Sequence, residues 1–210
     1  MRQILPLALA GLALPACALL PKETVAPGSA SADWRTVTTS SDRERLSDWR
    51  TAFTRALDQA QKAGRSVEID REGRLLEPDA ATGPVPIPNG HYRCRVIKIG
   101  AKSPGLLDYV AYPAFRCRVT QAGAVQHFAK LTGSQRHVGN IFRGDPLRQV
   151  FLGTLALSDE TRAFQYGRDP DRDVAGWVER IEPNRWRLIL PYPRFESTID
   201  VIELIPETAQ

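Results

Sequence analysis

One short pattern occurs twice in the chain and constrains its fold more than any other feature. Tyr92–Val96 and Phe115–Val119 both read aromatic-Arg-Cys-Arg-Val, and their cysteines, Cys94 and Cys117, are 23 residues apart. Residues in a strand alternate between its two faces, so the aromatic residue, the cysteine and the valine share one face. If the two strands are antiparallel neighbours, the cysteines can lie opposite each other, close enough for a disulfide.

The N-terminus has the pattern of an export signal. Met1–Gln3 contains one positive charge, and Ile4–Ala16 contains none. As a helix, this apolar stretch would extend only about 20 Å, which is short of a hydrocarbon core of about 30 Å. We therefore predict a signal peptide over residues 1–16 rather than a membrane anchor.

Two cleavage sites fit the residues that follow. Leu14–Cys17 resembles the bacterial lipobox, in which the cysteine is lipidated. Ala18, which follows the cysteine, favours sorting to the outer membrane, so the protein would lie in the periplasm. Residues 17–32 would then be a lipid-anchored flexible tether, since they are small, polar and proline-containing. The alternative is an A-x-A site over Ala16–Ala18, which would release a soluble periplasmic protein.

Either cleavage removes Cys17 from thiol chemistry and leaves two cysteines. In an oxidising compartment, Cys94 and Cys117 most simply form one disulfide. For a loop of this size, the bond should stabilise the folded domain by roughly 3 kcal/mol. The alternative is a pair of free, buried thiols.

Composition excludes several classes of protein. The 210 residues are 42% hydrophobic and carry 28 Lys+Arg against 24 Asp+Glu, a net charge of +4 that is too small to indicate a nucleic-acid partner. We expect one ordinary domain over residues 33–206. No P-loop and no dinucleotide-binding fingerprint is present, so no cofactor is expected.

The first part of this domain is predicted to be helical. Ser41 and Glu44 form a capping box, apolar residues recur at helical spacing, and Gly64 ends the pattern, which predicts an amphipathic helix over residues 42–63. A weaker helical stretch, 67–76, contains a glycine. Prolines then exclude regular structure in a linker over residues 78–90.

From residue 91 to residue 205 the pattern changes to strands. Residues 121–124 and 182–185 read as hairpin turns. The expected strands are 91–99, 115–120, 125–131, 149–157, 174–181, 186–190 and 198–205. We predict an α+β fold, with the helix packed on an antiparallel barrel-like or strongly curved sheet of six or more strands. The final strand is apolar on both faces, as expected if the helix covers its outer side. An open sandwich is the alternative.

Several of these segments together resemble one exported bacterial family, domain-of-unknown-function family 4893. The segments that carry the resemblance are Tyr92–Lys98, Phe115–Arg118, Lys130–Arg136, Phe151–Leu155, Tyr166–Pro170, Trp186–Leu188 and Phe195–Ser197. The resemblance extends from about Asp33 to Pro206. It implies no activity, because none is established for the family.

Four arginines flank the two cysteines and are candidates for an anion-binding stripe. Like charges opposite each other on neighbouring strands are destabilising without a counter-charge. The candidates are Arg93, Arg95, Arg116 and Arg118. The counter-charge is either an anionic ligand or the carboxylates of Glu179, Asp200 and Glu203 on other strands.

A second candidate site is an acidic loop. Asp169, Asp171 and Asp173 have the spacing of a calcium-binding loop, but Val174 stands where the turn glycine belongs and Arg180 where the bidentate glutamate belongs. They are a weak metal candidate, and a polar loop is the alternative.

The third candidate is a polar loop at a barrel rim. Its residues are Lys130, Thr132, Ser134, Gln135, Arg136 and His137. Ser134 with His137 or His127 would suggest a hydrolase, yet no G-x-S-x-G elbow surrounds the serine and no H-E-x-x-H motif is present. We predict a non-catalytic binding or structural module of the cell envelope. Its partners are the membrane, through the lipid anchor, and an envelope protein or a small anionic ligand. The alternatives are a hydrolase or a calcium-dependent module.

Overall fold

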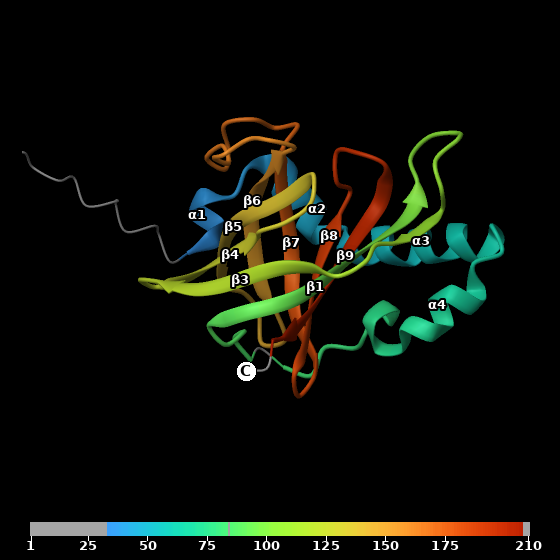
Figure 1. Cartoon of the computed structure of the whole chain (residues 1–210), viewed down its shortest axis with the longest axis horizontal. Helices are drawn as coiled ribbons and strands as arrows, with labels where there is room; N and C mark the ends of the chain where they lie inside the picture. Colours follow the sequence, from blue (N-terminus) through green and yellow to red (C-terminus); the bar gives the residue numbers. More distant parts are fainter. Residues whose placement is uncertain (1–32, 84, 208–210) are drawn as a thin grey trace, which may run out of the picture.

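The computed structural model describes residues 33–83 and 85–207, and the signal peptide and tether predicted over residues 1–32 lie outside that part of the chain. Eight antiparallel strands form a closed barrel, against which the helices pack (Figure 1). The barrel strands are β1 Gly90–Ala101, β3 Phe115–Ala122, β4 Val125–Lys130, β5 Gln135–Arg143, β6 Gln149–Leu157, β7 Asp173–Glu182, β8 Arg185–Pro191 and β9 Ser197–Pro206. Each strand pairs with the next, and β9 pairs with β1 to close the wall.

The disulfide is confirmed. Cys94 and Cys117 are bonded, with their Cα atoms 5.9 Å apart. They are not directly opposite each other, however: Cys94 is opposite Phe115, and Cys117 is opposite Tyr92. The sulfur atoms therefore join a diagonal pair on the inner face, and the two strands are offset by two residues from the predicted register.

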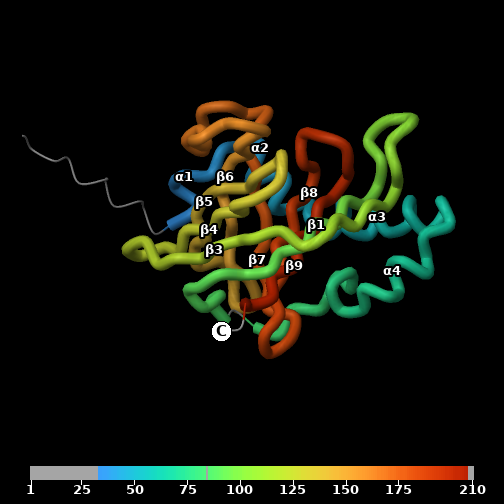
Figure 2. Tube along the Cα trace, in the orientation of Figure 1, coloured from blue at the N-terminus to red at the C-terminus, as the bar shows by residue number. Residues whose placement is uncertain are grey.

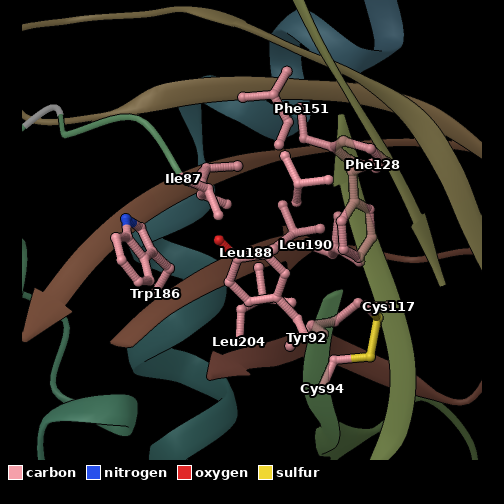
Figure 3. Packing of buried hydrophobic residues seen from close by; sticks show 14 of the residues in the cluster. Ile87, Tyr92, Cys94, Cys117, Phe128, Phe151, Trp186, Leu188, Leu190 and Leu204 are labelled. Carbon is pink, nitrogen blue, oxygen red and sulfur yellow. A yellow bond between two sulfur atoms is a disulfide. The ribbon is translucent and has the colours of Figure 1, made fainter. Parts of the chain in front are cut away.

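The barrel interior is apolar over most of its length. Side chains at alternate positions of the strands meet there, as Figure 3 shows for Phe128, Phe151, Leu188 and Leu204 beside the disulfide. Gly139 of β5 lies opposite Gly153 of β6, and this glycine pair lets the two strands approach closely. A Cβ atom on Gly153 would lie 2.5 Å from both the Phe151 ring and the Val138 carbonyl oxygen. The missing side chain gives the Phe151 ring its place.

The predicted helix over residues 42–63 is two helices, α2 Ser40–Ser47 and α3 Trp49–Lys62, which follow a short α1, Trp34–Val37. Thr39, rather than the predicted Ser41, caps α2 by accepting from the Asp42 amide. The break falls at Asp48, whose carboxylate accepts a hydrogen bond from the Tyr192 hydroxyl at 2.5 Å. Helical backbone hydrogen bonds continue on both sides of Asp48, so the break is a one-residue interruption between the two helices.

Helix α3 covers the outer side of β9, as the two apolar faces of that strand predicted. Phe53 and Ala56 of α3 belong to the same buried cluster as Ile199 and Val201 of β9. After α3 the chain forms α4, Ser66–Glu72, and the single 3-10 turn η1, Gly73–Leu76, in place of the weak helix 67–76. The tube trace in Figure 2 shows these segments crossing the outside of the barrel before the chain turns towards β1.

The proline-rich linker closes one end of the barrel. Ile87 is fully buried in the interior cluster. The Trp186 indole nitrogen donates to the Val85 carbonyl oxygen at 3.2 Å, and the Gln126 amide donates to the Ile87 carbonyl oxygen at 2.6 Å. The linker, although irregular, is therefore a plug whose backbone groups are paired by barrel side chains.

Candidate ligand-binding site

The other end of the barrel, which we call the mouth, contains a pocket of about 110 Å³. It lies where β1 changes partners. Gly90–Cys94 pairs with β3, whereas Ile97–Ile99 pairs with the short strand β2, Tyr109–Ala111. Strands β1 and β3 separate after the disulfide, and side chains line the gap between them. They are Val96, Lys98, Tyr112, Phe115, Lys130, Ser134, Gln135, His137 and Glu196.

Lys98 is the charged residue that β1 contributes. Its Nζ lies 3.0 Å from the Asp200 carboxylate and 3.1 Å from that of Glu196. Burial disfavours the charged amine, but the two carboxylates outweigh burial and raise the pKa of Lys98. The Ser197 hydroxyl donates a further hydrogen bond to Asp200. Lys98 is therefore a charged and fully compensated group.

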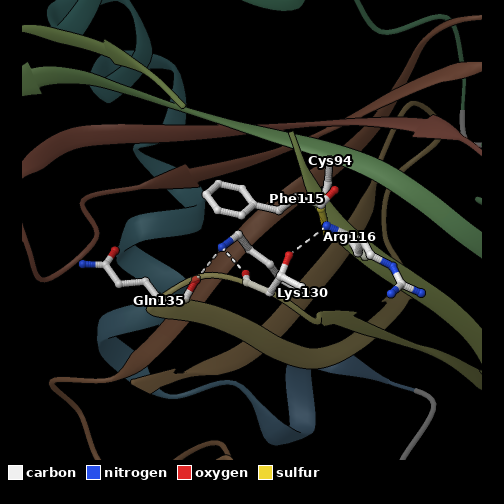
Figure 4. Close-up of a disulfide and its surroundings, with 7 residues drawn as sticks. Cys94, Phe115, Arg116, Lys130 and Gln135 are labelled. Carbon is white, nitrogen blue, oxygen red and sulfur yellow. Dashed lines mark hydrogen bonds between the residues drawn. A yellow bond between two sulfur atoms is a disulfide. The ribbon is translucent and has the colours of Figure 1, made fainter. Parts of the chain in front are cut away.

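Lys130, at the end of β4, has a different environment. Its Nζ donates to the carbonyl oxygens of Thr132 and Gln135, at 2.8 and 2.9 Å, and lies 3.6 Å from the centroid of the Phe115 ring (Figure 4). Within the part of the chain that the structure describes, no carboxylate pairs with it. Burial, together with the charges of Arg136 and Lys98, lowers the pKa of Lys130 to about 8.

Gly133 allows this arrangement. It lies in the β4–β5 turn with a φ of +91°, and a Cβ atom there would lie 2.7 Å from the Lys130 Nζ and 2.8 Å from the Phe115 ring. A side chain at this position would fill the space that the ammonium group occupies.

His137 forms the buried wall of the pocket. Only 2% of it is exposed, and its Nδ1 has no hydrogen-bond partner among the described residues. Burial, reinforced by the charges of Lys98 and Lys130, lowers the pKa of His137 to about 3, so the imidazole is neutral at pH 7. An unpaired, buried nitrogen is costly, and it belongs to a residue that lines the pocket.

The mouth therefore combines an ammonium group that has no carboxylate partner among the described residues, a neutral imidazole and apolar walls. Among the described residues Ser134 forms no side-chain hydrogen bond to His137 or His127, and the His127 ring nitrogen is paired with Asn140 instead, at 3.2 Å.

The predicted rim residues divide into two groups. Lys130, Ser134, Gln135 and His137 line the pocket. Thr132 and Arg136 hold the turn: the Thr132 hydroxyl accepts from the Arg116 amide, and Arg136 donates to the carbonyl oxygens of Ser158 and Glu160. The prediction of one loop over these residues is wrong in one respect. Gln135, Arg136 and His137 begin strand β5, which was not predicted.

The four candidate arginines lie on the outer side of β1 and β3. Arg95 forms ion pairs with Glu72 and Glu203, so the predicted compensation by Glu203 is present there. Glu179 instead pairs with Arg148 and Arg187, and Asp200 faces the interior. Arg93, Arg116 and Arg118 form no side-chain hydrogen bond or ion pair within the described residues.

The acidic loop does not gather its carboxylates around one point. Asp169 accepts from the Asp171 amide, Asp171 pairs with Arg194 at 2.8 Å, and Asp173 accepts from the Gly167 amide. Within residues 33–83 and 85–207, no group of three His, Cys, Asp or Glu side chains is placed to hold a metal ion.

Sequence reasoning missed Lys98 and the inward position of Asp200. The signal was present in the alternation of the strand, because Tyr92, Cys94 and Val96 define one face of β1 and Lys98 is the next residue on that face. A charged residue continuing an apolar face indicates a polar end of the barrel interior.

The fold and the mouth define a class of protein, a closed eight-stranded antiparallel barrel that is plugged at one end and has a polar pocket at the other. The family model described as Domain of unknown function (DUF4893) matches residues 34–204, and the chain belongs to this family. Neither the curated proteins nor the solved structures contain a significant match to the chain. Across the described residues, no helix is both long enough and apolar enough to cross a membrane.

Proposed function

We propose that this protein is an exported, lipid-anchored envelope protein and a non-catalytic binding module, and that its barrel mouth takes a small anionic ligand. The observation that carries the proposal is the pairing of Lys130, whose charge no described carboxylate neutralises, with the unpartnered, buried His137. An anionic oxygen would compensate the charge and accept a hydrogen bond from the imidazole.

The size of the pocket limits the ligand. A cavity of about 150 Å³ takes a benzene ring. The mouth, at about 110 Å³, fits a buried group of roughly five heavy atoms. Val96, Tyr112 and Phe115 supply apolar contact for a short stem, so a small carboxylate attached to a few carbon atoms is the simplest occupant.

Export is supported by the disulfide, since such bonds persist in oxidising compartments. Lipidation at Cys17 is tested by the intact mass of the mature protein. Three acyl chains on a chain that begins at Cys17 support it, and an unmodified chain that begins at Leu19 contradicts it.

Ligand binding is tested by NMR titration of the full chain with butyrate and with the uncharged butyramide. We expect butyrate, but not butyramide, to shift the His137 ring resonances, and the Lys130→Met variant to abolish the effect. His127→Gln, on the outer wall, is the matched control and should bind butyrate normally. Equal shifts with both probes, or none with butyrate, would contradict an anion site.

A further inference from the structure

The outer wall of the barrel carries a second basic surface, unrelated to the pocket. We call it the arginine face and define it as Arg93 of β1 with Arg116 and Arg118 of β3. Arg93 lies directly opposite Arg116 in the antiparallel register, and Arg118 lies two residues further along β3, opposite His91. Figure 4 shows the Arg116 side chain directed away from Lys130 and the pocket.

All three arginines of this face are exposed. Side chains directly opposite each other in such a pair have Cβ atoms about 5 Å apart, so like charges there repel. Arg95, the next outward residue on β1, shows that the fold supplies carboxylates where it needs them, because Glu72 and Glu203 bracket its guanidinium and raise the pKa of Arg95. The arginine face has no such carboxylates among the described residues.

We propose that the arginine face docks on the phosphate groups of an anionic phospholipid surface. Guanidinium groups bind phosphate oxygens through paired hydrogen bonds, and basic residues at a charged membrane surface add to one another. The three side chains project from the outer wall of the barrel, which suits an extended array of headgroups.

The position of the N-terminus favours a membrane over a soluble polyanion. Trp34 packs on the cluster that contains Val125, the first residue of β4. In Figure 1 the described chain begins on the side of the barrel towards which the β3–β4 hairpin extends, and this hairpin follows the strand that carries Arg116 and Arg118. A sixteen-residue flexible tether has a root-mean-square length of about 20–24 Å. This step rests on the proposed lipid attachment at Cys17, which would hold the arginine face within reach of the bilayer.

The test separates docking from anchoring by using the full chain with Cys17→Ser, which has no site for acylation. We expect it to co-sediment with phosphatidylglycerol vesicles at least tenfold more strongly than with phosphatidylcholine vesicles, and to lose this preference as salt concentration rises. Replacing Arg93, Arg116 and Arg118 by glutamine should abolish the preference.

The matched control replaces three exposed arginines elsewhere, Arg71, Arg143 and Arg168, by glutamine. It removes the same charge from a chain of net charge +4 and should keep the preference. Equal loss in both triple variants, or binding to soluble polyphosphate without binding to vesicles, would overturn the proposal. An unmodified mass at Cys17 with intact vesicle preference would refute the anchor and leave the docking surface in place.

Discussion

Arg187 of β8 and Glu179 of β7 lie opposite each other and form an ion pair of 2.6 Å in which both side chains are fully buried. The same guanidinium donates to the carbonyl oxygens of Leu75 and Glu77, each at 2.7 Å. These oxygens belong to the segment between α4 and the linker. This segment contains the turn η1 and forms no strand pairing. One side chain therefore attaches the irregular part of the chain to the barrel wall.

Arg187→Met should lower the free energy of unfolding by about 3–5 kcal/mol, because it leaves Glu179 with less compensation and several buried carbonyl oxygens without a donor. Urea denaturation of the purified protein measures the change. The comparison is Arg50→Ala, which removes an exposed ion pair with Asp79 and should have a much smaller effect, because solvent screens that pair. Similar losses in the two variants would show that Arg187 is not the attachment described above.

Replacing both Cys94 and Cys117 by alanine should lower the free energy of unfolding by roughly 3 kcal/mol, since the bond closes a loop of 23 residues in the unfolded chain. Denaturation with and without a reductant measures the same quantity in the natural protein. Reductant should have no effect on the double variant, and a residual effect there would mean that the bond is not its target.

The stability of the protein should fall in mild acid because of His137. The folded state keeps this imidazole neutral down to a pKa of about 3, whereas an unfolded histidine takes up a proton near pH 6.5. Between these values the unfolded state binds one more proton, so the free energy of unfolding falls as pH falls, by up to about 1.4 kcal/mol per pH unit. Denaturation at pH 6.5 and 5 should show a loss of about 2 kcal/mol that His137→Gln lacks. His127→Gln should behave as the natural protein does, and equal pH profiles for all three would contradict the assignment.

Gly153→Ala should cost about 2–3 kcal/mol, because the new methyl group would press on the Phe151 ring and on the backbone of β5. Gly123→Asn is the comparison. Gly123 lies in an open turn with a φ of +62°, a conformation that asparagine tolerates, and we expect a loss below about 1 kcal/mol. Thermal unfolding measures the stability of both variants. A Gly153→Ala protein as stable as the natural one would show that β5 and β6 can move apart at no cost.

Elements with a complete local signal were predicted from the sequence. The hairpin turns at residues 121–124 and 182–185 connect β3 to β4 and β7 to β8, as expected. The helix that covers the last strand was also predicted, because the apolar stripe of α3 and the two apolar faces of β9 each require a partner. These signals depend only on side chains within one segment.

The missed elements lack that local signal. Strand β5 places Gln135, His137 and Gly139 on its inner face, so its alternation does not read as apolar and polar. The reason is its position, since these residues line the mouth and approach β6 closely. Strand β2 is only three residues long. The diagonal register of the cysteines follows from how β1 and β3 align, which the two matching pentapeptides do not specify.

The candidate site was only partly predictable for a related reason. Lys130, Ser134 and His137 lie close together along the chain and were grouped as one polar segment. Lys98 and Glu196 come from distant strands and loops, and only the closure of the barrel between β1 and β9 brings them to the same opening.

The plug at the far end has a consequence for how a ligand is exchanged. Residues 85–88 stop the barrel with the chain's own backbone, whose Val85 and Pro88 carbonyl oxygens accept hydrogen bonds from Trp186 of β8 and Tyr92 of β1. If the mouth binds the proposed ligand, the ligand must therefore enter and leave through the mouth. The dissociation rate of that ligand would then depend on the β4–β5 turn and on the loop that contains Glu196, because both border the mouth. Slow dissociation would require these two segments to move slowly.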